Sequence, residues 1–259
     1  MRSEELGVIL FADQSKILDL RKLICKKNIY ACKIACLLDS YGLKYDFAEF
    51  WLQYENNEPV TAISKFYGDM TVCTTEKTDF DELKEFLLIT GFSSVISEKE
   101  IFYGSYKGIV MEKVAESQDI TVEINPDLNE VYRLLESCKS NNFEVPEYED
   151  FILDMSHKIR HKTALCVGVR EDEKLISTAM TVAQSETCAI IGAVSTDENY
   201  RHSGYGGKCV KTLCGLMNGR KIFIMRDEFE NENFYKSMGF ENKGKFYISK
   251  GEGKYDTVL

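Results

Sequence analysis

The sequence lacks an apolar run near the roughly 18 residues needed to span a bilayer. The apolar segment at residues 7–12 is too short for a secretory signal, and acidic residues precede it. We therefore expect a cytoplasmic protein with no membrane partner.

Basic charge is also scarce, because 32 Lys and Arg face 42 Asp and Glu, which gives a net charge of −10. The long-range field of such a chain repels polyanions, so we expect no general affinity for nucleic acid or anionic membranes. A local basic pocket for a phosphorylated ligand is still compatible with this charge. An acidic surface also favours a cationic substrate such as an amine.

Metal-binding patterns are missing as well. The nine cysteines include no C-x-x-C pair, and their odd, scattered placement predicts free buried thiols in a reducing cytosol. His157 and His161 have the i, i+4 spacing of a zinc site on a helix, but the Glu of an H-E-x-x-H motif is absent. Lys158, Arg160 and Lys162 surround them, which favours a solvated basic face. We expect no metal.

The second half of the chain has a clear order of elements. With 259 residues and 44% hydrophobic content, the chain can form one large domain or two ordinary ones. Periodicity and turn residues predict an α+β arrangement around one mixed sheet. The expected elements are a strand at 120–124, helices at 125–138 and 146–159, strands at 163–170, 174–183 and 187–196, a helix at 206–217, a strand at 221–225, a short helix at 231–238 and a strand at 245–249.

The first half is a weak echo of this order. Its expected elements are helices at 15–27 and 28–41, strands at 46–54, 60–67 and 70–74, a helix at 79–90 and a strand at 92–97. T-A-I-S-K-F from Thr61 and L-I-S-T-A-M from Leu175 occupy corresponding places, although chance similarity is an alternative for such short matches. We predict two tandem copies, residues 1–113 and 114–259, of which the first is degenerate.

The two predicted copies differ most clearly in a glycine-bearing loop. R-x-x-G-x-G, formed by Arg201, Gly204 and Gly206, stands between the strand at 187–196 and the helix that follows. Several backbone N–H groups and the positive end of the helix dipole then converge on one point, which favours a phosphate-type anion. A plain strand-to-helix turn is the alternative, since a glycine pattern alone is weak evidence. The first copy has no such loop before its helix at 79–90.

Two motifs decide between these alternatives. V-S-T-D-E-N-Y-R-H-S-G-Y-G-G from Val194 and N-E-N-F-Y-K-S-M-G-F from Asn231, with a strand between them, resemble the GNAT family of acyl-CoA-dependent N-acyltransferases. The resemblance covers about residues 118–250. L-D-S-Y-G-L through A-E-F-W, from Leu38, looks like the front domain of bacterial two-domain members. The resemblance to this family implies a GNAT-like, mostly antiparallel mixed sheet flanked by helices in both copies.

The resemblance also implies acetyl-CoA as co-substrate and a set of residues that bind it. The end of the strand would pair with the pantetheine amides, and the loop amides would hold the pyrophosphate. Arg201 would face the phosphates or pin the loop, and Asn231 would face the cofactor arm or act as a simple N-cap. The implied cofactor-binding residues are Ala193, Val194, Ser195, Thr196, Arg201, His202, Ser203, Gly204, Tyr205, Gly206, Gly207, Asn231 and Tyr235.

Tyr235 occupies the position where family members often carry a general acid for the CoA thiolate. A phenol with a pKa of about 10 can donate to such a thiolate, and the alternative is a core aromatic beside Phe234. No general base is assigned, because Glu186 lies in a turn between strands and Glu123 and Glu144 are unplaced. Glu198 stands where the family usually has proline.

The expected activity is transfer of an acetyl group from acetyl-CoA to a primary amine, by direct attack in a ternary complex. The acceptor is a small molecule in preference to a protein, and the sequence leaves homodimerisation open. A non-catalytic acyl-CoA-binding or sensing protein is the alternative. In a third interpretation, the front domain is a protein-interaction surface. Because only the second copy carries the loop, we expect one CoA per chain.

Overall fold

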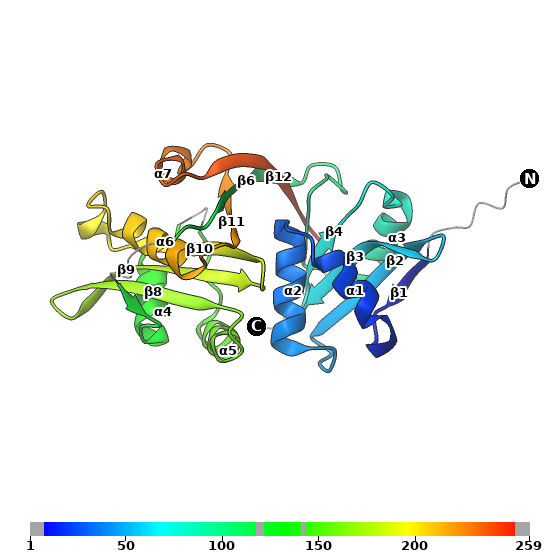
Figure 1. The fold of residues 1–259 in the computed structure, drawn as a ribbon, viewed down its shortest axis with the longest axis horizontal. Helices are drawn as coiled ribbons and strands as arrows, with labels where there is room; N and C mark the ends of the chain where they lie inside the picture. Colours follow the sequence, from blue (N-terminus) through cyan, green and yellow to red (C-terminus); the bar gives the residue numbers. More distant parts are fainter. Residues whose placement is uncertain (1–7, 118–121, 141–142, 252–259) are drawn as a thin grey trace, which may run out of the picture. The chain divides into compact units, whose positions relative to one another are not determined.

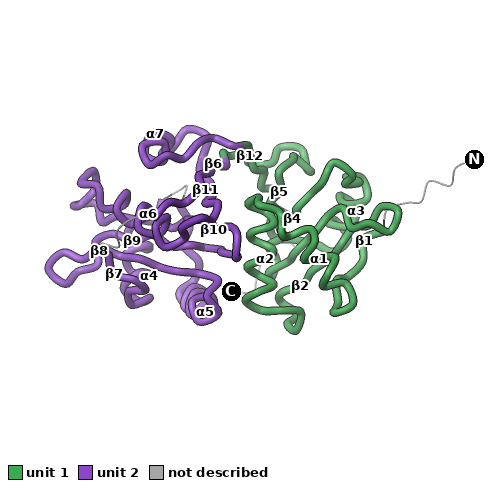
Figure 2. The backbone as a smooth tube through the Cα atoms, in the orientation of Figure 1, with its two compact units in different colours: residues 1–109, 244–259 green, residues 110–243 purple. Residues whose placement is uncertain are grey.

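The computed structural model describes residues 8–117, 122–140 and 143–251. The chain divides into two compact units, shown in Figure 2: unit 1 comprises residues 1–109 and 244–259, and unit 2 comprises residues 110–243. These units differ from the division at 113/114 because the end of the chain belongs to unit 1. The domain division drawn from the sequence stays a prediction.

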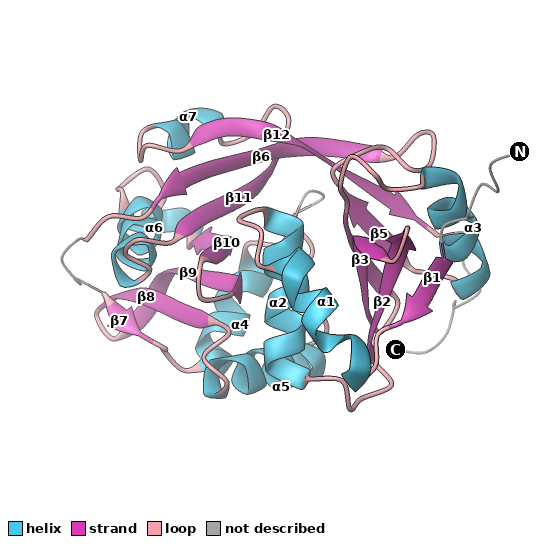
Figure 3. Cartoon of the chain, turned by 45° about the vertical axis from the view of Figure 1, so that its right-hand side comes forward, coloured by secondary structure: helices cyan, strands magenta, loops and turns pink. Residues whose placement is uncertain are grey.

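Unit 1 is a sheet with helices on both faces. Its strands lie in the order β1-β2-β3-β4-β5-β12, and its pairs are antiparallel except β4 with β5. Helices α1 and α2 cover one face and α3 the other (Figure 3). The elements are β1 (Val8–Phe11), α1 (Ile17–Ile24), α2 (Ile29–Tyr41), β2 (Ala48–Glu55), β3 (Glu58–Phe66), β4 (Asp69–Cys73), α3 (Phe80–Thr90), β5 (Ser94–Ser97) and, from residue 244 onward, β12 (Glu241–Lys250).

Unit 2 has the same kind of sheet, in the order β6-β11-β10-β9-β8-β7. Strands β7 to β10 pair antiparallel, and β10 pairs parallel with β11 across α6. The elements, labelled in Figure 1 except for β7, which is labelled in Figure 3, are β6 (Tyr106–Val114, within unit 2 from residue 110), β7 (Glu123–Ile124), α4 (Leu128–Ser137), α5 (Tyr148–Arg160), β8 (Leu165–Glu171), β9 (Lys174–Gln184), β10 (Cys188–Thr196), α6 (Tyr205–Leu216), β11 (Lys221–Asp227) and α7 (Glu232–Lys236).

The core of unit 2 lies on both faces of its sheet. Helices α4 and α5 bury Leu135 and Phe151 against Met180 of β9. Side chains alternate between the faces of a strand, and Ser177 of the same strand contacts Cys209 of α6, with Sγ 3.8 Å from Oγ. Helix α6 therefore packs on the opposite face, where it spans β8, β9 and β10.

The two units repeat one order of elements. Unit 1 runs β1-α1-α2-β2-β3-β4-α3-β5, and unit 2 runs β7-α4-α5-β8-β9-β10-α6-β11. The predicted α+β fold in tandem, with mostly antiparallel sheets flanked by helices, is confirmed. Two strands were not predicted, β1 and β6. Of the strand expected at 120–124, residues 120 and 121 lie outside the described residues, and the observed strand is Glu123–Ile124.

All nine cysteines lie in described segments and are free thiols, seven of them buried, with Cys25 exposed and Cys138 half-buried. No helix among the described residues is long and apolar enough to cross a membrane.

Candidate functional site

Strand β10 separates from β11 before it ends. Their parallel register stops at Ile191, paired with Ile224, although β10 continues to Thr196. On its other side β10 gains one residue against β9, and Ala193 there has a φ of +49°. An extra residue in this conformation is a β-bulge, which bends the strand end away from its neighbour. On the side toward β11, the backbone of residues 192–196 has no registered partner within the described sheet.

The start of α6 is an open helix N-terminus. Gly204 is its N-cap residue with a φ of +86°, and no side chain caps the helix. The first helical hydrogen bond runs from Lys208 N to Gly204 O, at 3.0 Å. The N–H groups of Tyr205, Gly206 and Gly207 therefore have no acceptor inside the helix. Three donors and the positive end of the helix dipole are left for an anion.

Gly206 holds α6 directly against the end of β10. A Cβ atom at this position would lie 3.2 Å from Thr196 Oγ1, 3.6 Å from Val194 Cγ1 and 3.7 Å from Phe234 Cζ. A side chain here would crowd Thr196, so the helix and the strand could not pack this closely without a shift. The same contacts bring Phe234 of α7 to the site, a residue for which the sequence indicated no role.

Tyr235 lies beside Phe234 on α7. The two rings are 4.9 Å apart, and Phe240 packs edge-on at 6.0 Å. Burial raises the pKa of Tyr235 to about 12. Among the described residues the hydroxyl has no hydrogen-bond partner, and no unpartnered side-chain oxygen is buried, so this hydroxyl reaches solvent. Tyr235 is a protonated donor without an acceptor of its own.

These features match one known family. Residues 128–240 fit the model of the acetyltransferase (GNAT) family. The protein carries a GNAT domain.

Solved structures extend the likeness to the tandem architecture. A tandem GNAT protein from the clavulanic acid biosynthesis pathway is 9% identical, with a TM-score of 0.58, and the match covers 97% of this chain and 100% of that one. A GCN5-related N-acetyltransferase from Sphaerobacter thermophilus is 12% identical, with a TM-score of 0.57 and coverage of 93% and 94%. N-myristoyltransferase from Saccharomyces cerevisiae with bound myristoyl-CoA is 10% identical, with a TM-score of 0.60 and coverage of 96% and 78%. At these identities the likeness concerns the fold. A comparison with curated protein sequences gave no match.

The loop of the GNAT domain is held by its own side chains. Arg201 Nε donates to Thr196 O at 3.2 Å, so Arg201 does pin the loop to the end of β10. Ser203 Oγ donates to Arg201 O at 3.4 Å, and His202 has a φ of +61°. These contacts fix the backbone of the loop, while the exposed guanidinium nitrogens of Arg201 are not used in them.

Asn231 does not act as a simple side-chain cap. It has a φ of +59° before α7, and its exposed side chain makes no capping hydrogen bond. The described contacts leave this side chain open to a ligand, which is compatible with the other interpretation, contact with the cofactor arm.

Two other predicted residues can contribute through their backbone. Ser177 Oγ donates to Ser195 O at 3.2 Å and lies 2.9 Å from Thr196 Oγ1. Ser195 is buried, and the Thr196 hydroxyl is engaged with Ser177. Because Ser195 O and Thr196 O also accept hydrogen bonds, from Ser177 Oγ and Arg201 Nε, any contribution of these two residues to a ligand is limited to their main-chain N–H groups.

The unassigned carboxylates and the histidine pair lie elsewhere in the GNAT domain. Glu186 is in the turn that precedes β10, at the strand end opposite Thr196. Glu123 accepts a hydrogen bond from Arg170 Nε at 2.7 Å. His157 and His161 stack 4.3 Å apart on α5, and the described residues contain no group of three metal-ligating side chains.

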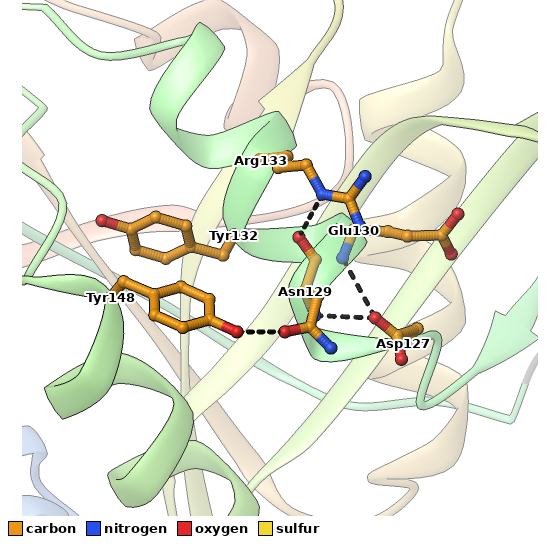
Figure 4. A pocket seen from close by; sticks show the side chains of 6 residues that line it. All are labelled: Asp127, Asn129, Glu130, Tyr132, Arg133 and Tyr148. Atoms are coloured by element: carbon orange, nitrogen blue, oxygen red, sulfur yellow. Dashed lines mark hydrogen bonds between the residues drawn. The ribbon is translucent and has the colours of Figure 1, made fainter.

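A hollow of about 700 Å³ lies at the start of α4, lined by tyrosines and charged residues (Figure 4). Its polar groups bind one another. Asp127 accepts from the N–H groups of Asn129 and Glu130, the Arg133 side chain donates to Asn129 O, and the Tyr148 hydroxyl binds the Asn129 side chain. None of the predicted site residues lines it.

Proposed function

We propose that the protein is an acetyl-CoA-dependent N-acetyltransferase that acts on a primary amine. One observation carries the proposal: the uncapped start of α6 packs through Gly206 on the splayed end of β10, with Phe234 against the same junction and Tyr235 packed on Phe234. An anion site and a strand end that has left β11 meet there, and a phenol lies one ring away.

Each part of the junction suits one part of acyl-CoA, the co-substrate that GNAT proteins use. The N–H groups of Tyr205, Gly206 and Gly207 would bind the pyrophosphate, and the positive φ of Gly204 lets the backbone turn toward it. The free edge of residues 192–196 would pair with the pantetheine amides. The open side chain of Asn231 would contact the same arm.

The reaction requires three operations. The neutral amine attacks the thioester carbonyl carbon, the carbon–sulfur bond breaks, and the amine proton leaves to solvent or a base. Placing both substrates in line would supply much of the rate enhancement, and main-chain N–H groups at the bulge of β10 would stabilise the oxyanion. The Tyr235 hydroxyl would donate its proton to the departing thiolate.

Acetyl as the acyl group and a small molecule as the acceptor are part of the proposal. The same fold carries myristoyl-CoA in the yeast N-myristoyltransferase structure, so the fold alone does not select the acyl chain. The net charge of −10 favours a cationic acceptor such as a small amine, and it suits a cytoplasmic protein that binds neither nucleic acid nor membrane.

The test is an incubation of the full chain with acetyl-CoA and a panel of primary amines. We expect release of free CoA thiol, with a mass increase of one acetyl group on at least one amine. Tight binding of CoA without transfer to any amine or to protein lysines would instead favour the acyl-CoA-sensing alternative.

A further inference from the structure

Arg226 is a buried charge at the end of β11. Its side chain is 3% exposed. One nitrogen, Nη1, donates to three main-chain carbonyls in the segment that follows: Asp227 O at 2.8 Å, Glu228 O at 2.9 Å and Glu230 O at 3.4 Å. Three carbonyls drawn to one nitrogen give this segment a defined path between β11 and α7.

A second nitrogen, Nη2, fixes the start of α7 itself. Nη2 of Arg226 lies 3.2 Å from Glu232 Oε2 and donates to Asn242 Oδ1 at 3.2 Å. Asn242 Nδ2 in turn donates to Glu232 Oε1 at 3.0 Å, and Lys236 Nζ lies 2.6 Å from the same oxygen. Glu232 is therefore held from three sides, and it is the first residue of the helix that carries Tyr235.

Helix α7 needs this support. It has five residues, and a helix of that length is unstable alone because the first turn costs more than it returns. Burying a guanidinium is also costly unless its donors are satisfied. Here Nη1 and Nη2 donate to the segment 227–232 and its neighbour Asn242, and Nε donates to Met111 Sδ of β6 at 3.3 Å. Only the planar fork of arginine reaches these acceptors together, which a lysine point charge cannot do.

We infer that Arg226 is a positioning residue: by fixing the segment 227–232, it holds α7 in place and with it Tyr235, whose ring packs on Phe234 beside Gly206. The effect of Arg226 on turnover rests on the proposed function, in which Tyr235 is the general acid. The effect of Arg226 on the position of the Tyr235 side chain does not depend on that function. The experiment therefore measures the two effects separately.

The first readout is structural. The full chain is labelled with 3-fluorotyrosine, and the ¹⁹F resonance of Tyr235 is assigned as the one lost in Tyr235→Phe. In Arg226→Lys we expect this resonance to shift or broaden. Arg170→Lys is the matched control, because Arg170 also joins two carboxylates, Glu123 and Glu130, and one carbonyl, Glu173 O. An unchanged resonance in Arg226→Lys, or an equal change in the control, overturns the inference.

The second readout is turnover of acetyl-CoA, followed by thiol release with the best amine of the panel. We expect Arg226→Lys to lower kcat by about 10- to 100-fold, as a misplacement near 1 Å does, with the affinity for CoA unchanged. In a Tyr235→Phe background, Arg226→Lys should lower kcat no further. If the double variant instead shows the product of the two single losses in kcat, Arg226 does not act through Tyr235. Should Arg226→Lys not fold, Glu232→Gln replaces it in both readouts. If Tyr235→Phe itself keeps full activity, Tyr235 is not the general acid. The ¹⁹F resonance still tests whether Arg226 positions Tyr235.

Discussion

Tyr235 is the residue whose surroundings bear most directly on chemistry. Its ring packs between Phe234 and Phe240, its hydroxyl has no described partner, and burial raises its pKa to about 12. Such a phenol keeps its proton at any physiological pH. It therefore enters the reaction with its proton in place, although the raised pKa makes it a weaker acid than an ordinary tyrosine, and it is unsuited to act as the base that deprotonates the amine.

Replacing Tyr235 by Phe tests this role. We expect kcat to fall about 100-fold, near the lower end for loss of a general acid, with the affinity for CoA unchanged because no binding group is removed. Tyr132→Phe is the control, since the Tyr132 hydroxyl donates to Pro146 O on the α4–α5 side. An unchanged kcat, with chemistry shown to be rate-limiting, would remove Tyr235 from the mechanism.

The raised pKa of Tyr235 also predicts how stability depends on pH. The folded state holds this proton to about pH 12, whereas the unfolded state releases it near pH 10. The free energy of unfolding therefore falls as pH rises from about 10 to 12. From pH 9 to pH 11 the free energy of unfolding, measured by urea denaturation, should therefore fall by about 1.4 kcal/mol less in Tyr235→Phe than in the wild-type protein. Equal losses would mean that Tyr235 titrates normally in the folded state.

Two residues of the junction could not be predicted from the sequence. Phe234 was recognised only as a neighbour of Tyr235, because its contact with Gly206 joins helices that are distant in sequence. Arg226 stands at the end of a mostly apolar strand, and three of its acceptors are main-chain carbonyls, which leave no mark in a residue pattern. The glycines and Tyr235 could be named as candidates from the sequence because their residue types belong to the motifs themselves.

At the scale of elements, the bulge of β10 and the start of α6 together form the proposed binding site. The bulge turns the strand end away from β11, and Gly206 lets the helix start against it. Most helices and strands were predictable because their apolar residues are periodic. Strand β1 has only four residues at a sheet edge, three of them with large exposed apolar side chains, so it shows no alternation. Strand β6 was missed because its neighbour β11 is far along the chain.

A matched pair of glycines tests the start of α6. Gly204 and Gly219 flank this helix with φ values of +86° and +80°, and a Cβ atom added at either residue would meet no neighbouring atom within 4 Å. Alanine at either site should therefore cost about 1 kcal/mol of stability through backbone strain. Only Gly204→Ala should weaken CoA binding, by about fivefold if that strain is relieved by moving the loop. Calorimetry and urea denaturation measure both effects, and equal CoA affinities in the two variants would contradict the site.

At the scale of the whole molecule, the two units treat the equivalent helix start differently. Helix α3 of unit 1 is closed by Asp79, whose Oδ1 accepts from Asp81 N at 3.0 Å and Glu82 N at 3.1 Å. Asp81 and Glu82 add negative charge to its first turn. A carboxylate thus occupies the place where α6 leaves N–H groups open, which makes unit 1 unsuited to a second phosphate.

The end of the chain makes unit 1 depend on the last strand. Tyr247 to Lys250 pair with β5, and Ser249 Oγ lies 2.7 Å from Ser105 Oγ. A fragment of residues 114–259 keeps this strand without β5 and also lacks β6, so it exposes unpaired strand edges. We expect the fragment to aggregate or to melt below the full chain, as measured by size-exclusion chromatography and thermal unfolding. A monomeric fragment with the melting temperature of the full chain would show that this pairing contributes little.

The central claim is one acyl-CoA site per chain, at the junction of β10 and α6. Calorimetric titration of the full chain with CoA tests it most directly, with Gly206→Val as the comparison because its side chain would meet Thr196 at once. We predict one site in the wild-type protein and no measurable binding in a folded Gly206→Val variant. Two sites per chain, or unchanged affinity in that variant, would contradict the claim.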